Sequence, residues 1–518
     1  MDINQAFKTT FKLLLGAEPQ LELDDIAEYL KRWHANPTLV SSSISGKPVS
    51  VSSDMYKKNL KFISEDEIDF SKNFKLDINE IKDIDSIVEA IQDRVYYAGN
   101  KVLGESKDIE NSDNIFNSYY VRNSSNISAC KYVAYTSHIR DSSEFIFGCT
   151  WFLRSKYLIR CLGADNITRC FETYYSTNSS DLFFCFGCHA TTNAMFSFNL
   201  RSKRNVIGNL ELPKDKYAQL RKKLVDESRE YLEKHKDFYS IFDWQKPSQE
   251  LAIVLKSKVN LPQAKKPKTN FEVIDSAFKS TCKVVLGQEI GSLKEYENYL
   301  LEGQQPVQKV DTFFGNKTYF SPFLFFGQIP KSRMLSLEEA EEMGKQHVQI
   351  EDSDNLETIM KKIADVAFFR IDLDEGKNEN NDYTHVVYHG SHSYKVADIT
   401  FGKYCAYSTL ALNSEYLFGT NWAIHSQFSI KCYNSVNLTR CFELSDCRSC
   451  TDSYFCHNSE NLNDCMFCFN TKSKRYAIAN VEVGKERYME IKKLVLKEIA
   501  AKLEKNKILE WSIFNLSR

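Results

Sequence analysis

The sequence predicts an α+β protein built as a tandem duplication, in which each copy carries a short parallel β-solenoid. Three observations predict this architecture: a repeat at an offset of 271 residues, a finer period of twelve residues inside each copy, and a charged amphipathic segment after each periodic array. In each copy we expect a helical or mixed opening segment, then the solenoid, then a capping helix. A chain of 518 residues is long enough for two or more domains.

The duplication becomes visible when residue i is laid over residue i+271. The segment AFKTTFKLLLG, residues 6–16, then falls on AFKSTCKVVLG, residues 277–287. Residues 161–217 and 432–488 align without a gap, and 22 of these 57 positions are identical. Chance would give about one position in fifteen to twenty, so the repeat is secure.

The same order of segments is expected in both copies. The predicted ranges are 1–110 for the helical or mixed segment of copy one, 111–212 for its solenoid, 213–244 for its capping helix, 245–270 for a linker rich in Pro and Lys, 271–395 for the helical or mixed segment of copy two, 396–483 for its solenoid and 484–518 for its capping helix.

Large apolar residues recur at every twelfth position of each array. In copy one this column is Phe147, Ile159, Phe171, Phe183, Met195 and Ile207. Two residues further on, a column of smaller side chains is Cys149, Cys161, Thr173, Cys185, Ser197 and Asn209. Residues i and i+2 of a strand share a face, so each unit predicts one short strand with one large and one small inward side chain. A 24-residue coil with two strands is the alternative, because Phe is bulky for the thin core of a twelve-residue rung.

The residues between these two columns are expected to face outward. Arg160 then precedes Glu172 by one rung, and Lys431 precedes Glu443, which places opposite charges about 4.8 Å apart. Later in each array the same column becomes apolar, as Phe184 and Phe196 in copy one and Phe455 and Phe467 in copy two. An exposed apolar ladder needs a cover. We expect the following helix to supply it, and a partner interface is the alternative.

Three C-x-x-C pairs raise the possibility of a metal site. The set with the clearest zinc spacing is Cys447, Cys450, Cys465 and Cys468. These pairs do not superpose between the copies, and several cysteines fall in the small-residue column, where a thiol packs as a small apolar group. We therefore expect packing and no cofactor, with zinc as the alternative. The 15 cysteines are expected to be reduced rather than paired.

A basic turn recurs in both copies, with Lys203 and Arg204 in the first and Lys474 and Arg475 in the second. Two basic residues at one fixed turn predict a contact with an anion or a partner. A turn that only caps the solenoid explains the same residues.

The closing segment of each array, MFCFNTKSKRYAIANVEVGKERY in copy two, resembles one found in uncharacterised Cys- and aromatic-rich repeat proteins of small-genome archaea and candidate-phylum bacteria. The resemblance covers about a fifth of the chain per copy. Copy one departs from it at Ser197 and Asn205, which stand where a Cys and a Tyr are usual. The resemblance implies a fold and no activity.

Composition and motifs favour a non-enzymatic protein. The net charge of −2 does not indicate a nucleic-acid partner. The chain lacks an apolar run of about 18 residues, so no membrane partner is expected, and its first residues do not resemble a signal peptide, which predicts a cytoplasmic protein. GxSxG, HExxH and Gly-rich phosphate motifs are missing. We expect a structural or binding scaffold that engages a protein partner or self-assembles. A zinc-binding protein and a solenoid-fold enzyme are the alternatives.

Overall fold

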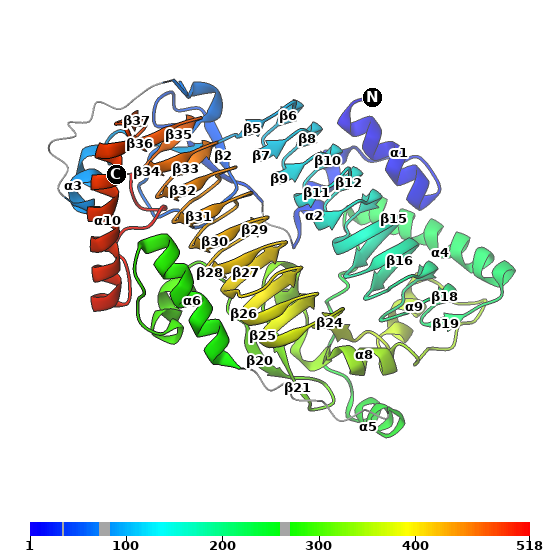
Figure 1. The fold of residues 1–518 in the computed structure, drawn as a ribbon. Helices are drawn as coiled ribbons and strands as arrows, with labels where there is room; N and C mark the ends of the chain where they lie inside the picture. Colours follow the sequence, from blue (N-terminus) through cyan, green and yellow to red (C-terminus); the bar gives the residue numbers. More distant parts are fainter. Residues whose placement is uncertain (34–35, 72–82, 260–269, 518) are drawn as a thin grey trace.

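Two parallel β-solenoids lie side by side, and helices flank each of them (Figure 1). The structure is a computed structural model that describes residues 1–33, 36–71, 83–259 and 270–517. The predicted α+β class and the duplicated solenoid are confirmed. None of the helices within these ranges combines the length and the apolar character that a bilayer crossing requires.

The helices are α1 (Ile3–Leu15), α2 (Ala27–Lys31), α3 (Ile84–Ile91), α4 (Lys214–His235), α5 (Gln249–Lys258), α6 (Phe271–Leu286), α7 (Glu297–Leu300), α8 (Leu337–Met343), α9 (Leu356–Ile363) and α10 (Lys485–Asn506). Short strands outside the solenoids are β1 (Thr38–Ser41), β2 (Pro48–Val51), β3 (Phe62–Ser64), β4 (Tyr97–Gly99), β20 (Gln308–Asp311), β21 (Lys317–Phe320), β22 (Met334–Leu335) and β23 (Phe369–Arg370).

The first solenoid consists of β5 (Val102–Leu103), β6 (Lys107–Glu110), β7 (Asp113–Phe116), β8 (Tyr119–Arg122), β9 (Ser125–Ser128), β10 (Lys131–Ala134), β11 (Ser137–Arg140), β12 (Glu144–Phe147), β13 (Thr150–Leu153), β14 (Lys156–Ile159), β15 (Leu162–Tyr174), β16 (Thr177–Phe186), β17 (Thr192–Met195), β18 (Arg204–Ile207) and β19 (Leu210–Glu211).

The second solenoid consists of β24 (Leu373–Glu375), β25 (Glu379–Tyr388), β26 (Ser391–Thr400), β27 (Ala406–Leu412), β28 (Glu415–Phe418), β29 (Ala423–Ile424), β30 (Gln427–Ile430), β31 (Thr439–Phe442), β32 (Thr451–Tyr454), β33 (His457–Glu460), β34 (Asn463–Met466), β35 (Phe469–Lys472), β36 (Arg475–Ile478) and β37 (Val481–Glu482). Both arrays begin before the predicted starts at 111 and 396, since β5 and β24 already belong to the parallel sheets.

Successive rungs are twelve residues apart, so the shorter predicted coil length is correct. Many rungs carry two short strands rather than the expected one, as β7 and β8 do, whereas β15 runs as one strand of 13 residues. Asp113 pairs with Ser125, and Ser125 pairs with Ser137. Two rungs of the first solenoid hold an extra residue, because Val102 pairs with Ile115 and Ser137 pairs with Thr150. The last strand of each solenoid, β19 or β37, turns back antiparallel on its neighbour.

Every third residue of the rungs adopts left-handed backbone, with φ of 54° at Arg160, 47° at Glu172 and 54° at Phe184. This conformation turns the chain at each corner of the small coil. The corner amides stay bonded: the Arg160 N–H donates to the Phe147 carbonyl at 2.9 Å, and the Tyr175 N–H donates to the Leu162 carbonyl at 2.9 Å. Hydrogen bonds along the ladder therefore offset the unfavourable φ, which Asn and Asp tolerate best.

The interior of each solenoid is lined by small and aliphatic side chains, and the prediction that the large column points inward is wrong. The first interior contains Cys149, Cys161 and Ala194 together with Ile139 and Leu158, and its core cluster includes no aromatic residue. Phe147 instead faces outward and packs against Phe7 of α1, with ring centroids 5.5 Å apart. Since inward positions recur every third residue, a twelve-residue rung encloses too little space for Phe.

Four long helices cover the outward apolar columns. Helices α1 and α4 lie on the first solenoid, and α6 and α10 lie on the second (Figure 1). Phe184, Phe196, Phe455 and Phe467 are all fully buried. The prediction that the capping helices cover this ladder is confirmed, because Tyr217 and Leu220 of α4 share one core with Phe184, and Tyr488 and Ile491 of α10 share one with Phe455.

Between its opening helix and its solenoid, each copy has an end module that covers the last rungs of the other copy's solenoid. The end module of copy one is residues 36–71 and 83–100, and that of copy two is residues 307–371. The Asn470 Nδ2 donates to the Tyr96 carbonyl at 2.8 Å, and the Asn199 Nδ2 donates to the Phe368 carbonyl at 2.9 Å. Each of the two large cores therefore contains residues of both copies.

The predicted linker, 245–270, contains the helix α5, whose N-terminus is capped by Ser248. Residues 260–269 of this linker lie outside the described residues. The helix packs its Leu255 beside Phe368 and Met343, which places it on the end module of copy two.

Replacing Cys432 with Phe tests the assignment of the inward positions. We expect Cys432→Phe to lower the free energy of unfolding by about 1–3 kcal/mol through overpacking, because the interior accepts Leu444 on the next rung but its core cluster includes no aromatic ring. Cys432→Ser should cost less, because the inward Ser435 already donates to the Tyr433 carbonyl at 2.6 Å and accepts from the Cys447 N–H at 3.1 Å. A urea titration measures both. The control Gln427→Phe lies on the exposed side of β30, and equal losses for Cys432→Phe and Gln427→Phe would contradict the assignment.

Cutting the chain between residues 263 and 264 at an introduced protease site tests the exchange of end modules. We expect the two fragments to elute together at the volume of the uncut chain in size-exclusion chromatography, because each core is built from both copies. Separation of the fragments without denaturant would show that the end modules do not hold the halves together.

Candidate functional site

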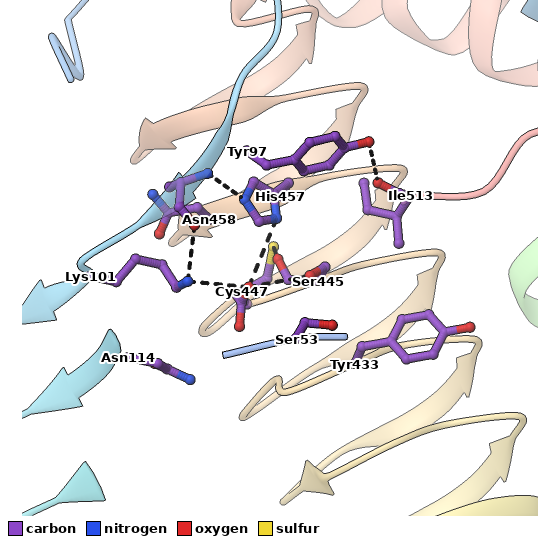
Figure 2. A network of polar contacts seen from close by, with 12 residues as sticks. Ser53, Tyr97, Lys101, Asn114, Tyr433, Ser445, Cys447, His457, Asn458 and Ile513 are labelled. Atoms are coloured by element: carbon purple, nitrogen blue, oxygen red, sulfur yellow. Dashed lines mark hydrogen bonds and ion pairs between the residues drawn. The ribbon is translucent and has the colours of Figure 1, made fainter. Parts of the chain in front are cut away.

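A buried polar cluster lies where the end module of copy one meets the second solenoid (Figure 2). We call Lys101, Asp113, Asp446 and His457 the junction cluster. Lys101 precedes β5 and Asp113 begins β7, whereas Asp446 and His457 belong to successive rungs of the second solenoid. Their side chains have exposed fractions of 1%, 0%, 3% and 0%. Four ionisable groups from both copies therefore share one site without access to bulk water.

One ammonium group faces two carboxylates in this cluster. The Lys101 Nζ lies 2.8 Å from the Asp113 Oδ2 and 3.7 Å from the Asp446 Oδ2, and it donates to the Ala98 carbonyl at 3.1 Å. Asp113 also accepts from the backbone N–H of Ser52 at 2.7 Å. Burial opposes the charge of Lys101, but the two carboxylates outweigh it and raise its pKa. Burial raises the pKa of Asp446 in spite of the nearby ammonium.

His457 is held neutral by its surroundings. Its Nε2 accepts the backbone N–H of Ala98 at 3.0 Å, so the ring proton belongs on Nδ1, which lies 4.0 Å from the Asp446 Oδ2. Burial, and then the charge of Lys101, hold the pKa of His457 well below its usual value. Because a backbone amide already occupies Nε2, this nitrogen is not free to take a proton from a substrate.

Several buried polar atoms around the cluster have no hydrogen-bond partner among the described residues: the Ser52 Oγ, the Tyr56 hydroxyl, the Asp446 Oδ1 and the His457 Nδ1. A buried donor or acceptor without a partner costs about 1–3 kcal/mol. The cluster is therefore an energetically expensive way to join the two copies.

The cluster occurs at only one of the two junctions. At the offset of 271 residues, Asp446 corresponds to Tyr175 and His457 to Phe186. Phe186 meets Phe369 edge to face at 4.9 Å, just as His457 meets Tyr97 at 5.1 Å. The packing geometry is thus shared by both junctions, but the ionisable groups differ, since at the other junction the Arg370 guanidinium lies 4.7 Å from the ring centroid of Tyr175.

The cysteines proposed as metal ligands line the interior of the second solenoid. Residues three apart both point inward, which explains the C-x-x-C spacing. The Cys447 thiol donates to the carbonyls of Ser445 and Cys456, both at 3.3 Å. All 15 cysteines are buried and unpaired, and burial raises the pKa of the Cys447 thiol.

In the part of the chain that the structure describes, no cluster of three or more Cys, His, Asp or Glu side chains could hold a metal ion. Cys450, Cys465 and Cys468 also donate to backbone carbonyls rather than converging with Cys447 on a common point. The zinc hypothesis stays a prediction.

The basic turns lie on the surface at the last rungs. Lys203 forms an ion pair with Glu211 at 2.6 Å, and Arg204 is exposed at the start of β18. In copy two, Arg475 is exposed and its guanidinium lies 5.0 Å from the ring centroid of Tyr476, while Lys474 is half-buried. The predicted anion contact at these turns stays a prediction.

The charge ladder between the columns is present, but it is buried rather than exposed. Arg160 lies 3.3 Å from Glu172, and Lys431 lies 3.7 Å from Glu443. Tyr29 of α2 donates to Glu172 at 2.6 Å, and the Ile513 N–H donates to Glu443 at 2.9 Å. The prediction that these charged side chains point out of the solenoid is correct. They are nevertheless buried, because α2 and the C-terminal residues cover the two ion pairs.

Sequence reasoning missed the junction cluster altogether. Asp446 and His457 stand among outward residues of a regular array, and Lys101 lies more than 300 positions away in the chain. The available signal was the break in the duplication, since charged or polar residues of copy two replace Tyr175 and Phe186 of copy one.

Comparison with protein-family models, with curated proteins and with solved structures finds no match to this chain.

Replacing His457 with Phe, the residue of the other junction, tests its buried neutral state. A histidine that is neutral in the folded state and protonated in the unfolded state makes stability fall as pH drops below about 6.5, by at most about 1.4 kcal/mol per pH unit. We expect His457→Phe to reduce the loss of unfolding free energy between pH 7 and pH 5. Urea titrations at both pH values measure it.

The residual slope in that variant should come in part from His385, whose pKa burial lowers to about 3. The matched control is His425→Phe, at an exposed position, which should leave the wild-type slope nearly unchanged. Equal slopes for wild type and His457→Phe would refute a neutral His457.

Proposed function

We propose that this protein is a non-enzymatic scaffold whose solenoid faces engage a macromolecular partner or further copies of the chain. The observation that carries the proposal is a matching column of charged and polar residues, exposed or half-buried, on the outside of both solenoids. We call it the outer column. In copy one it is Lys107, Tyr119, Lys131, Glu144 and Lys156. In copy two it is Glu379, Ser391, Lys403, Glu415 and Gln427.

The outer column presents side chains at a fixed spacing on a rigid support. Successive rungs are about 4.8 Å apart. Lys156 pairs with Glu144 at 3.1 Å, and Lys403 pairs with Glu415 at 3.2 Å. Exposed pairs of this kind add little stability, so an external partner can exchange with them at small cost. Two such faces on one chain suit a long or repeated partner.

The buried ionisable groups support a structural role. Lys101 is held by two carboxylates, Nε2 of His457 by a backbone amide, and Glu172 by Tyr29 and Arg160. A surface depression of about 450 Å³ is lined by Lys57, Lys58, Asn59, Leu60, Asn515 and Ser517. Its lining contains no carboxylate, imidazole or thiol for acid–base or nucleophilic chemistry.

The ends of the solenoids favour lateral contacts over end-to-end stacking. The final rungs are closed by the antiparallel strands β19 and β37 and by the end modules. At the other end of the first solenoid, β6 exposes Lys107, Asp108 and Glu110, and charges on an edge strand oppose pairing with another strand.

Cross-linking of the protein in its native source, followed by mass spectrometry, tests the proposal. We expect cross-links to a partner or a second copy to concentrate at Lys107, Lys156 and Lys403. The double variant Lys156→Glu, Lys403→Glu should reduce the recovered complex at least about fivefold, because two favourable contacts become repulsive. Sedimentation of the pure protein separates self-assembly from a different partner.

The control is Lys493→Glu, on the exposed side of α10. A chain that stays monomeric and gives no cross-links above those of this control would contradict the scaffold. So would substrate turnover by the pure protein that Lys156→Glu, Lys403→Glu leaves intact.

A further inference from the structure

The two solenoids meet along a seam that carries an arginine from each copy. His138 of the first solenoid stacks on Trp422 of the second, with ring centroids 4.1 Å apart. The guanidinium carbon of Arg448 lies 3.9 Å from the ring centroid of Phe116. Arg448 of copy two therefore reaches across the seam onto the first solenoid.

Arg140 stands in the same column of the first solenoid as Phe116. Phe116 pairs with Ser128 on the next rung, and the register of Ile139 with Ile127 places Arg140 opposite Ser128 on the rung after that. Two rungs span about 10 Å along the solenoid axis. The two arginines therefore border one short stretch of the seam, and Ser128, which is half-buried, lies between them.

Neither guanidinium has a hydrogen-bond or ion-pair partner in the described part of the chain. The carboxylates near Arg448 are already engaged: Glu460 pairs with Lys472 at 3.6 Å, and Asp446 faces Lys101 at 3.7 Å. Asp141 follows Arg140 in the chain and is exposed. The seam therefore holds two neighbouring cations, and neither forms an ion pair with a carboxylate in the described part of the chain.

The electrostatics of Arg140 agree with this arrangement. Burial, and then the charge of Arg448, lower the pKa of Arg140 to about 10. Burial likewise lowers the pKa of Arg448. An anion placed between the two guanidinium groups would offset both their burial and their mutual repulsion. It supplies the opposite charge and accepts hydrogen bonds from the planar guanidinium groups.

We propose that Arg140 and Arg448 form a binding site for a small oxyanion of the phosphate class between the two solenoids. A doubly charged oxyanion neutralises both guanidinium groups, and the hydroxyl of Ser128 offers a further donor. The site uses one residue of each copy and lies away from the outer column, so it is independent of the proposed scaffold function and survives if that function is wrong.

Calorimetric titration of the intact protein with inorganic phosphate, at constant ionic strength set by chloride, tests the site. We expect one phosphate per chain for the wild type, and at least tenfold weaker binding for Arg140→Gln and for Arg448→Gln. The control Arg204→Gln, at an exposed position on β18, should bind as the wild type does. Absence of phosphate binding by the wild type, or equal affinity in all three variants, would overturn the proposal.

A second variant keeps the test decisive if loss of an arginine disturbs the fold. Arg140→Glu places a carboxylate where the anion would lie, opposite Arg448. We expect this variant to fold, to unfold at a higher temperature than phosphate-free wild type, and to gain no thermal stability from phosphate. If Arg140→Glu retains the thermal response of the wild type to phosphate, the anion binds elsewhere and the site is refuted.

Discussion

The twelve-residue rung is the constraint on which the rest of the structure depends. Closing a coil with so few residues requires a left-handed turn at every third position, and these turns leave an interior lined by Cys, Ser, Thr, Ala and the aliphatic Val, Leu and Ile. Aromatic side chains are thereby excluded from the core clusters of the inside. They appear on the outside instead, where they require long helices to cover them. The narrow interior of the coils is therefore the reason why long helices cover their outer faces.

The same constraint explains why cysteine is so frequent. An inward position every third residue turns any two neighbouring inward thiols into a C-x-x-C motif, without metal or redox chemistry. Inward serines are also small enough for the interior, and they form hydrogen bonds with the backbone of the next rung. The Ser176 Oγ, for example, accepts the Cys188 N–H at 3.1 Å. Spacing alone therefore does not distinguish a ligand pair from the lining of a narrow coil.

The repeat and the rung length could be read from the sequence, because both are periodic. The offset of 271 residues, the twelve-residue step and the covered ladder of Phe184 and Phe196 were all predictable. The outward direction of the Phe147 side chain was not predictable, because its neighbours alternate as in an ordinary strand. The pattern of apolar residues does not show which residues have a left-handed φ. The junction cluster was equally hidden, since Lys101 meets Asp446 only through the exchange of end modules.

The exchange of end modules also sets an order of events for a chain made from its N-terminus. The first solenoid is complete in sequence at Leu212, but the residues that cover its last rungs lie between 307 and 371. Until these have been synthesised, the outer faces of Phe186 and Phe198 lack Phe369, their aromatic neighbour in the finished protein. The nascent chain thus carries an open solenoid end through at least a hundred further residues, a period in which ribosome-associated chaperones have a surface to protect.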